Sequence, residues 1–184
     1  GYKSPPMGFI DENNEWVGFD ADIAREIARR LGAEPAFLKV SGEARIKTLL
    51  SGAVDLTIAH LNHTHTREKS IDFSQPYLWD HKKVLVQRRR FSSLRELSGK
   101  KIAIVNHSNA EIDILKQFEQ LDCPLPELVY YDSDADCFSA LKKGEVDAYT
   151  NDRILALTAS AGNPDFGFIE DAYSHTFFSI GIMK

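Results

Sequence analysis

The chain of 184 residues is 43% hydrophobic, enough to bury the core of one large domain or of two small ones. Its 22 Lys and Arg against 27 Asp and Glu leave a net charge of −5, spread along the chain without long charged blocks. This mildly acidic balance argues against a nucleic-acid partner, because the longest basic run, Arg88–Arg90, is too short to follow a phosphate backbone. No apolar stretch approaches the roughly 18 residues needed to cross a bilayer.

The first predicted helix follows Asp20 or Asp22 as its N-cap and ends at Gly32. Its apolar residues recur at helical spacing, at Ile23, Ile27 and Leu31. The next predicted elements are a strand over 35–40, a helix over 43–50 and a strand over 54–59.

A similar order returns later in the chain. The predicted elements are a strand over 101–105, a helix over 109–121 with Ile112, Leu115 and Phe118 on its apolar face, a strand over 127–131, a helix over 134–143 and a strand over 146–150. The phrase G-x-V-D occurs in both halves, at Gly52–Asp55 and Gly144–Asp147, each time between a helix and a strand.

Alternating strands and helices predict an α/β fold of two lobes, each a mostly parallel sheet flanked by helices. We expect lobe 1 to comprise residues 1–86 plus 176–184 and lobe 2 to comprise residues 87–175, with hinge strands near 82–88 and 176–183. In such sheets ligands bind beyond the carboxyl ends of the strands, and two facing lobes close on a ligand by a hinge motion.

Arg67 follows a predicted strand, and its planar guanidinium can bind a carboxylate through two parallel hydrogen bonds. The alternative is a surface arginine that pairs with Glu68 or Asp72. Asp152 follows the strand over 146–150, where it could accept hydrogen bonds from an ammonium group, cap the following helix, or do both. Asn106–Asn109 precedes a helix whose N-terminus favours an anion, although Ser108 or Asn109 could equally cap that helix.

His60, His63 and His65 invite a metal interpretation, but their spacing and the lack of an acidic fourth ligand favour pocket-lining or surface side chains. Cys123 and Cys137 could form one disulfide, although a small buried residue is the better interpretation of Cys137. No motif predicts covalent catalysis or a cofactor site.

Four phrases occur in a characteristic order over nearly the whole chain: Pro5–Phe9, Trp16–Asp22, Ile71–Tyr77 and Val146–Ala148. Together they resemble the polar-amino-acid solute-binding proteins of bacterial ABC importers, a two-lobed periplasmic binding protein family. The resemblance implies a protein that binds a free polar amino acid between its lobes and delivers it to a membrane ABC permease. It also implies a periplasmic or surface-anchored monomer without enzymatic activity.

The family pattern also assigns roles to residues. The arginine before the I-D-F-S phrase, here Arg67, holds the ligand α-carboxylate, and the aspartate after the V-D-A strand, here Asp152, holds the α-ammonium. The remaining implied ligand contacts are Ala59, His60, Asn62, Ser108, Asn109 and, as the nearest aromatic cover, Tyr2. His60, Asn62 and His107 depart from the small or hydroxyl residues usual in the family, and a polar uncharged or acidic amino acid is the expected ligand.

Two alternatives remain at this stage. The same module could serve as the ligand sensor of a membrane receptor, or as a dehydratase on the same fold, which requires an acid such as Glu43 or Glu111 in the cleft. The N-terminus lacks the features of a secretory signal, so we expect the export signal to have been removed. The family resemblance implies further elements before Gly1 and after Lys184, so we expect the chain to be trimmed at both ends.

Overall fold

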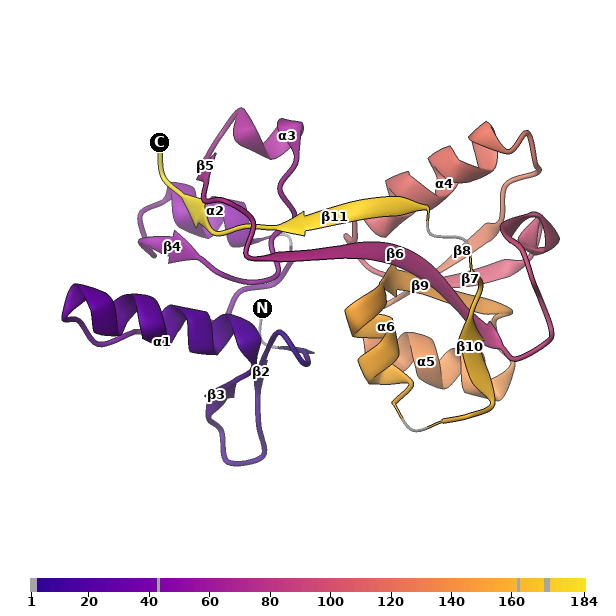
Figure 1. Ribbon diagram of the computed structural model, residues 1–184, viewed down its shortest axis with the longest axis horizontal. Coiled ribbons are helices and arrows are strands. Elements are labelled where there is room, and N and C mark those ends of the chain that lie inside the picture. The colour runs from indigo at the N-terminus through magenta and orange to yellow at the C-terminus, as the bar shows by residue number, and fades with distance from the viewer. Residues whose placement is uncertain (1–2, 43, 162, 171–172) are drawn as a thin grey trace. The chain divides into compact units, whose positions relative to one another are not determined.

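The computed structural model describes residues 3–42, 44–161, 163–170 and 173–184. The chain divides into two compact units. Unit 1 is Gly1–Trp79 with Thr176–Lys184, and unit 2 is Asp80–His175. Strands β6 (Leu78–Gln87) and β11 (Ser174–Phe178) contain the two points where the chain passes from one unit to the other, and they pair with each other (Figure 1).

Unit 1 contains two small sheets and three helices in the described residues. Their bounds are β1 (Lys3–Ser4), β2 (Gly8–Ile10), β3 (Trp16–Val17), α1 (Phe19–Leu31), α2 (Ala44–Leu50), β4 (Leu56–Thr57), α3 (His65–Glu68), β5 (Asp72–Phe73) and β12 (Gly181–Ile182). Strand β12 lies between β4 and β5 and is antiparallel to both. Leu49, Leu61 and Ile71 form the core beneath this sheet.

Helix α1 begins at Phe19 with Gly18 as its N-cap, two residues earlier than predicted with Asp20 as the N-cap and four earlier than with Asp22. Gly18 has φ 105° and ψ 171°, a conformation that is almost exclusive to glycine. The predicted N-cap, Asp20, is instead a buried residue of the first turn. The choice of Asp20 was wrong because the glycine backbone, not a side chain, makes the turn into the helix.

Gly18→Ala is expected to lower the free energy of unfolding by about 2 kcal/mol, measured by urea denaturation. A Cβ at Gly18 would lie 2.5 Å from the Met7 carbonyl oxygen. Gly32→Ala is the matched control, since Gly32 also has positive φ, at 68°, but open space around it. Equal losses in the two variants would contradict the role of the Met7 contact.

Two other predictions for unit 1 are wrong. Residues 35–40 form no strand, and β4 is shorter than the predicted strand over 54–59. A strand requires a hydrogen-bonded neighbour, which local β-propensity cannot supply. Leu31, predicted on the apolar face of its helix, is 75% exposed because the helix end projects beyond the packed part of the unit.

Unit 2 is built on a sheet with the strand order β10-β6-β9-β7-β8. Its further elements are a 3-10 helix (Leu94–Leu97), β7 (Lys101–Val105), α4 (Ala110–Gln120), β8 (Glu127–Tyr131), α5 (Asp134–Lys143), β9 (Ala148–Asp152), α6 (Arg153–Ala159) and β10 (Phe166–Phe168). Strand β7 is parallel to β8 and β9, whereas β6 is antiparallel to β9 and to β10. The predicted α/β class is therefore confirmed, with mixed sheets flanked by helices.

Successive side chains of a strand point to opposite sides of the sheet, and in unit 2 both sides are buried. Val84 and Ile102 pack with Phe118 of α4 on one face. Leu85 and Ala103 pack with residues of α5 and α6 on the other, and Figure 1 shows the helices on these two sides.

Two sequence predictions bear on these cores. Ile112, predicted on the apolar face of its helix, is 70% exposed, and the neighbouring Ile114 is buried instead. Both cysteines are free thiols, and Cys137 is a buried core residue as the simpler interpretation predicted.

Candidate functional site

The carboxyl ends of β7 and β9 lie at the same edge of the unit 2 sheet, because these strands are parallel neighbours. The loop Asn106–Asn109 follows β7, and Asp152 is the last residue of β9. The structure therefore brings the three predicted ligand residues of unit 2, Ser108, Asn109 and Asp152, to one edge of one sheet.

Asp152 is buried, with 4% of its surface exposed, and its side chain makes no capping hydrogen bond to α6. Asp80 of β6 takes that role, because its Oδ2 accepts from the Ile154 backbone N–H at 2.9 Å. The alternative that the Asp152 side chain caps the helix is therefore wrong. The helix is capped from another strand, which no local sequence pattern reveals.

Lys82 forms an ion pair with Asp152. Its Nζ donates to Asp152 Oδ1 at 3.0 Å and lies 3.5 Å from Asp113 Oδ2 on α4. The sequence identified neither Lys82 nor Asp113. The sequence does contain a signal that Lys82 is buried. Lys82, Val84 and Val86 occupy every second position of β6 and therefore lie on one buried face of the strand.

The N-terminus of α4 is partly occupied by its own loop. Ser108 Oγ accepts from the Ala110 backbone N–H at 3.2 Å, whereas Asn109 occupies the N-cap position without a side-chain cap. His107 has φ 59°, in the left-handed region. Of the two capping candidates, Ser108 is thus the one that bonds to the first turn.

Asn151, next to Asp152, is held by a second buried acid, Asp134. Asp134 Oδ1 accepts from Asn151 Nδ2 at 2.6 Å and also from the Tyr149 hydroxyl. Burial raises the pKa of Asp134, and the two hydrogen bonds oppose this rise. Asn151 Oδ1 in turn accepts from the Asp152 backbone N–H at 2.9 Å, so this network fixes the backbone at the end of β9.

In unit 1, the loop Ala59–Asn62 is held by side chains from other elements. The His60 backbone N–H donates to Asp20 Oδ2 at 2.6 Å, and the Tyr77 hydroxyl donates to Asp20 Oδ1 at 2.8 Å. Arg45 Nη1 donates to the Ala59 carbonyl at 2.6 Å. Burial raises the pKa of Asp20, whereas the hydrogen bonds from the Tyr77 hydroxyl and the His60 backbone N–H lower it. His60 has φ 35°, a strained value that this bracing maintains.

Asn62 lies at the end of the same loop. Its side-chain oxygen is buried and has no hydrogen-bond partner in the described part of the chain. Buried acceptors are usually satisfied, so this oxygen is a candidate to accept a hydrogen bond from a ligand.

Arg67 lies on the short helix α3 and is partly buried, and burial lowers the pKa of its guanidinium. Nη1 donates to the Asn62 carbonyl at 2.7 Å. No carboxylate pairs with Arg67 within the described residues, since Glu68 binds two histidines instead. The alternative of a surface arginine paired with Glu68 is therefore wrong. A partly desolvated guanidinium without an acidic partner is suited to bind an anion.

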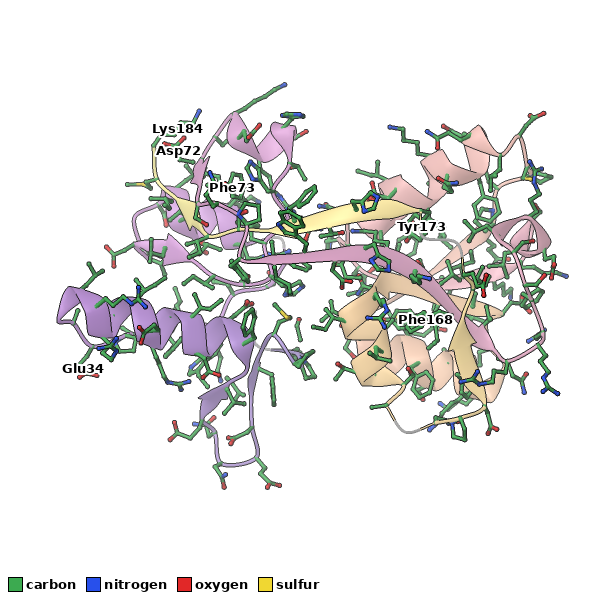
Figure 2. The ribbon with its side chains drawn as sticks, viewed as in Figure 1. Glu34, Asp72, Phe73, Phe168, Tyr173 and Lys184 are labelled. Carbon is green, nitrogen blue, oxygen red and sulfur yellow. The ribbon has the colours of Figure 1, made fainter. Side chains whose placement is uncertain are left out.

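The histidines do not form a metal site in the described residues. His63 Nε2 and His65 Nδ1 lie 2.7 and 2.8 Å from the two carboxylate oxygens of Glu68, and these contacts lower the pKa of Glu68. His63 also stacks on Phe73 of β5, which is labelled in Figure 2. Glu68, which lies just beyond the histidine segment on α3, is thus an acid next to His63 and His65 that the sequence analysis did not consider.

The other predicted candidates lie apart from these groups or outside the described residues. Tyr2 and Glu43 are outside them. Glu111 is partly buried, and it accepts a solvent-exposed hydrogen bond from the Tyr130 hydroxyl at 2.9 Å. A hollow of about 680 Å³ in unit 2, lined in part by Arg88, Phe91 and Phe166, contains none of the predicted ligand residues.

The chain crosses twice between two α/β units. One unit carries a guanidinium without a carboxylate partner among the described residues, and the other carries a buried carboxylate at a sheet edge. This is the architecture of a two-lobed ligand-binding protein. The family model of bacterial extracellular solute-binding proteins, family 3, matches residues 1–122. The chain belongs to this family. No helix in the described part of the chain is long and apolar enough to span a membrane.

Known relatives are similar over nearly the whole chain. The ABC transporter arginine-binding protein 1 of Escherichia coli is 27% identical over 97% of this chain and 72% of its own length. The glutamine-binding protein of Geobacillus stearothermophilus is 28% identical over 100% of this chain and 68% of its own length. The arginine-bound form of truncated ArgBP from T. maritima has a TM-score of 0.86 and 31% identity, covering 100% of this chain and 85% of that one. The names of these relatives describe binding proteins for arginine or glutamine.

Proposed function

We propose that this protein binds a free polar amino acid and delivers it to a membrane ABC permease, without catalysing a reaction. In this proposal Arg67 of unit 1 binds the α-carboxylate, and Asp152 of unit 2 accepts hydrogen bonds from the α-ammonium. Ala59, His60 and Asn62 add contacts from unit 1, and Ser108 and Asn109 add contacts from unit 2. Each unit acts as one lobe.

The observation that carries the proposal is that the Arg67 guanidinium is partly buried and has no carboxylate partner among the described residues. A guanidinium that is partly removed from water normally gains a carboxylate partner, and in the described residues Arg67 has none. The guanidinium donates to the Asn62 carbonyl through Nη1, which leaves further N–H donors for a planar anion. An α-carboxylate matches this fork through two parallel hydrogen bonds.

The buried carboxylate of Asp152 supports the other half of the clamp. Its side chain does not cap α6, because Asp80 does so, and it lies at the strand edge where ligands of α/β proteins bind. Relatives named for arginine and glutamine binding support an amino acid with a long polar side chain. Their membership of ABC transporters supports a permease as the partner and a location outside the cytoplasmic membrane.

A thermal-shift screen with the twenty amino acids tests this proposal. An amino acid present at about 100 times its Kd should stabilise the folded chain by about 2.7 kcal/mol, which for a chain of this size raises Tm by roughly 5 to 10 °C. Urea, which favours the unfolded state, serves as a control for the direction of the shift. If none of the twenty raises Tm, amino acid binding by this chain is ruled out.

A further inference from the structure

Lys82 and Asp152 form a buried ion pair inside unit 2. They are direct cross-strand neighbours on β6 and β9, so their side chains point to the same face of the sheet. Lys82 is 1% exposed and Asp152 is 4% exposed, and Nζ lies 3.0 Å from Oδ1. The carboxylate expected to receive a ligand ammonium therefore already has a positive charge at hydrogen-bonding distance.

This pair changes what the ligand must provide. If the ligand ammonium were the main counter-ion of a buried carboxylate, a ligand without that ammonium would leave the negative charge uncompensated, and it would be strongly rejected. Here Lys82 provides the compensation from within the protein. A ligand without an ammonium group then loses a hydrogen-bonded contact but leaves no isolated buried charge.

Asp113 limits how far Lys82 neutralises the site. Its Oδ2 lies 3.5 Å from Lys82 Nζ and accepts from the Ser174 hydroxyl at 3.0 Å. Two carboxylates thus share one ammonium, and this group of three carries a net charge of −1 when all are ionised. The Asp113 side chain is 32% exposed, so solvent screens its part of that charge. A ligand ammonium is still favoured, but only modestly.

We propose that this protein also binds carboxylic acids that lack the α-ammonium group, with Lys82 as the residue that sets this tolerance. The inference rests on the proposed amino acid site and widens its ligand class from amino acids to the corresponding des-amino acids. Arg67 binds the carboxylate in both cases. Lys82 contacts Asp152 and not the ligand, so it determines specificity through the charge of that carboxylate.

Isothermal titration calorimetry of the unmodified chain is the first test. The probe is the amino acid with the largest shift in the screen, paired with the same acid carrying hydrogen in place of the ammonium; for glutamine this is glutaramate. The amino acid should bind about 10-fold more tightly than its analogue, the effect of one charged hydrogen bond. A preference greater than about 100-fold overturns the inference, and a smaller one supports it.

Two variants test whether Lys82 is the residue that lets the protein bind acids without an α-ammonium group. In Lys82→Met the preference for the amino acid should rise about 100-fold over that of the unmodified chain, because the positive charge 3.0 Å from Asp152 Oδ1 is then lost and a ligand ammonium replaces it. Lys82→Arg keeps the charge and should keep the original preference. An unchanged preference in a folded Lys82→Met chain, checked by circular dichroism, overturns the assignment.

The two proposals fail in different ways. If no amino acid binds the unmodified chain, the proposed function is wrong. If an amino acid binds and its des-amino analogue does not, the proposed function stands and only this inference is wrong. Should Lys82→Met not fold, the comparison in the unmodified chain still decides.

Discussion

Arg67→Ala is expected to lower the affinity for the amino acid about 100-fold, with little change in the stability of the unliganded chain. Removing one partner of a hydrogen-bonded charge pair typically costs about 3 kcal/mol of binding free energy, because the ligand carboxylate is then desolvated without a partner. The folded chain loses only the bond from Nη1 to the Asn62 carbonyl. Calorimetric titration gives the affinity, and urea denaturation gives the stability.

Two further substitutions serve as comparisons for Arg67→Ala. Arg67→Lys keeps a positive charge but loses the planar fork, so an intermediate loss of about 10-fold is expected. Arg29→Ala is the matched surface control, since Arg29 pairs with Glu26 in an exposed position and its removal should leave binding unchanged. Full affinity in Arg67→Ala would show that another group holds the carboxylate.

Asp152→Ala is expected to abolish binding and also to lower the free energy of unfolding by about 3 kcal/mol. Lys82 would remain buried without its closest counter-ion, and Asp113, at 3.5 Å, compensates only in part. Sequence reasoning predicts an intact fold for this variant, because nothing in the chain indicates that a lysine depends on Asp152. Thermal and urea denaturation measure the loss.

A second substitution separates lost charge pairing from lost packing. Lys82→Met with Asp152→Leu removes both charges and should recover most of the stability, while the ligand still fails to bind. Glu127→Ala is the control for an exposed ion pair, because Lys101 Nζ and Glu127 Oε1 lie 3.9 Å apart on the surface. This variant should change the free energy of unfolding by less than about 0.5 kcal/mol. A double variant as unstable as Asp152→Ala would argue against a pairing role.

Much of unit 2 follows from its local sequence. The strands Lys101–Val105 and Glu127–Tyr131 and the helix Asp134–Lys143 have the predicted bounds. In these segments apolar periodicity and helix-stop signals agree with the burial that the sheet imposes. The short strands of unit 1 were predicted less well, because they depend on β12, a partner from the far end of the chain.

The sequence by itself determined the α/β class, the family resemblance and the choice of Arg67 and Asp152 as candidate ligand residues, because these depend on local patterns and on the order of motifs. Only the tertiary structure decided their surroundings. Glu68 binds the histidines, so that Arg67 has no acidic partner in the part of the chain that the structure describes, while Lys82 reaches Asp152 from 70 residues away along the chain. The charge around a ligand group is a sum over spatial neighbours, and such neighbours are set by strand pairing and helix packing and not by sequence proximity. For this reason Arg67 and Asp152 could be chosen from the sequence as candidate ligand residues, whereas the charged groups around them could not.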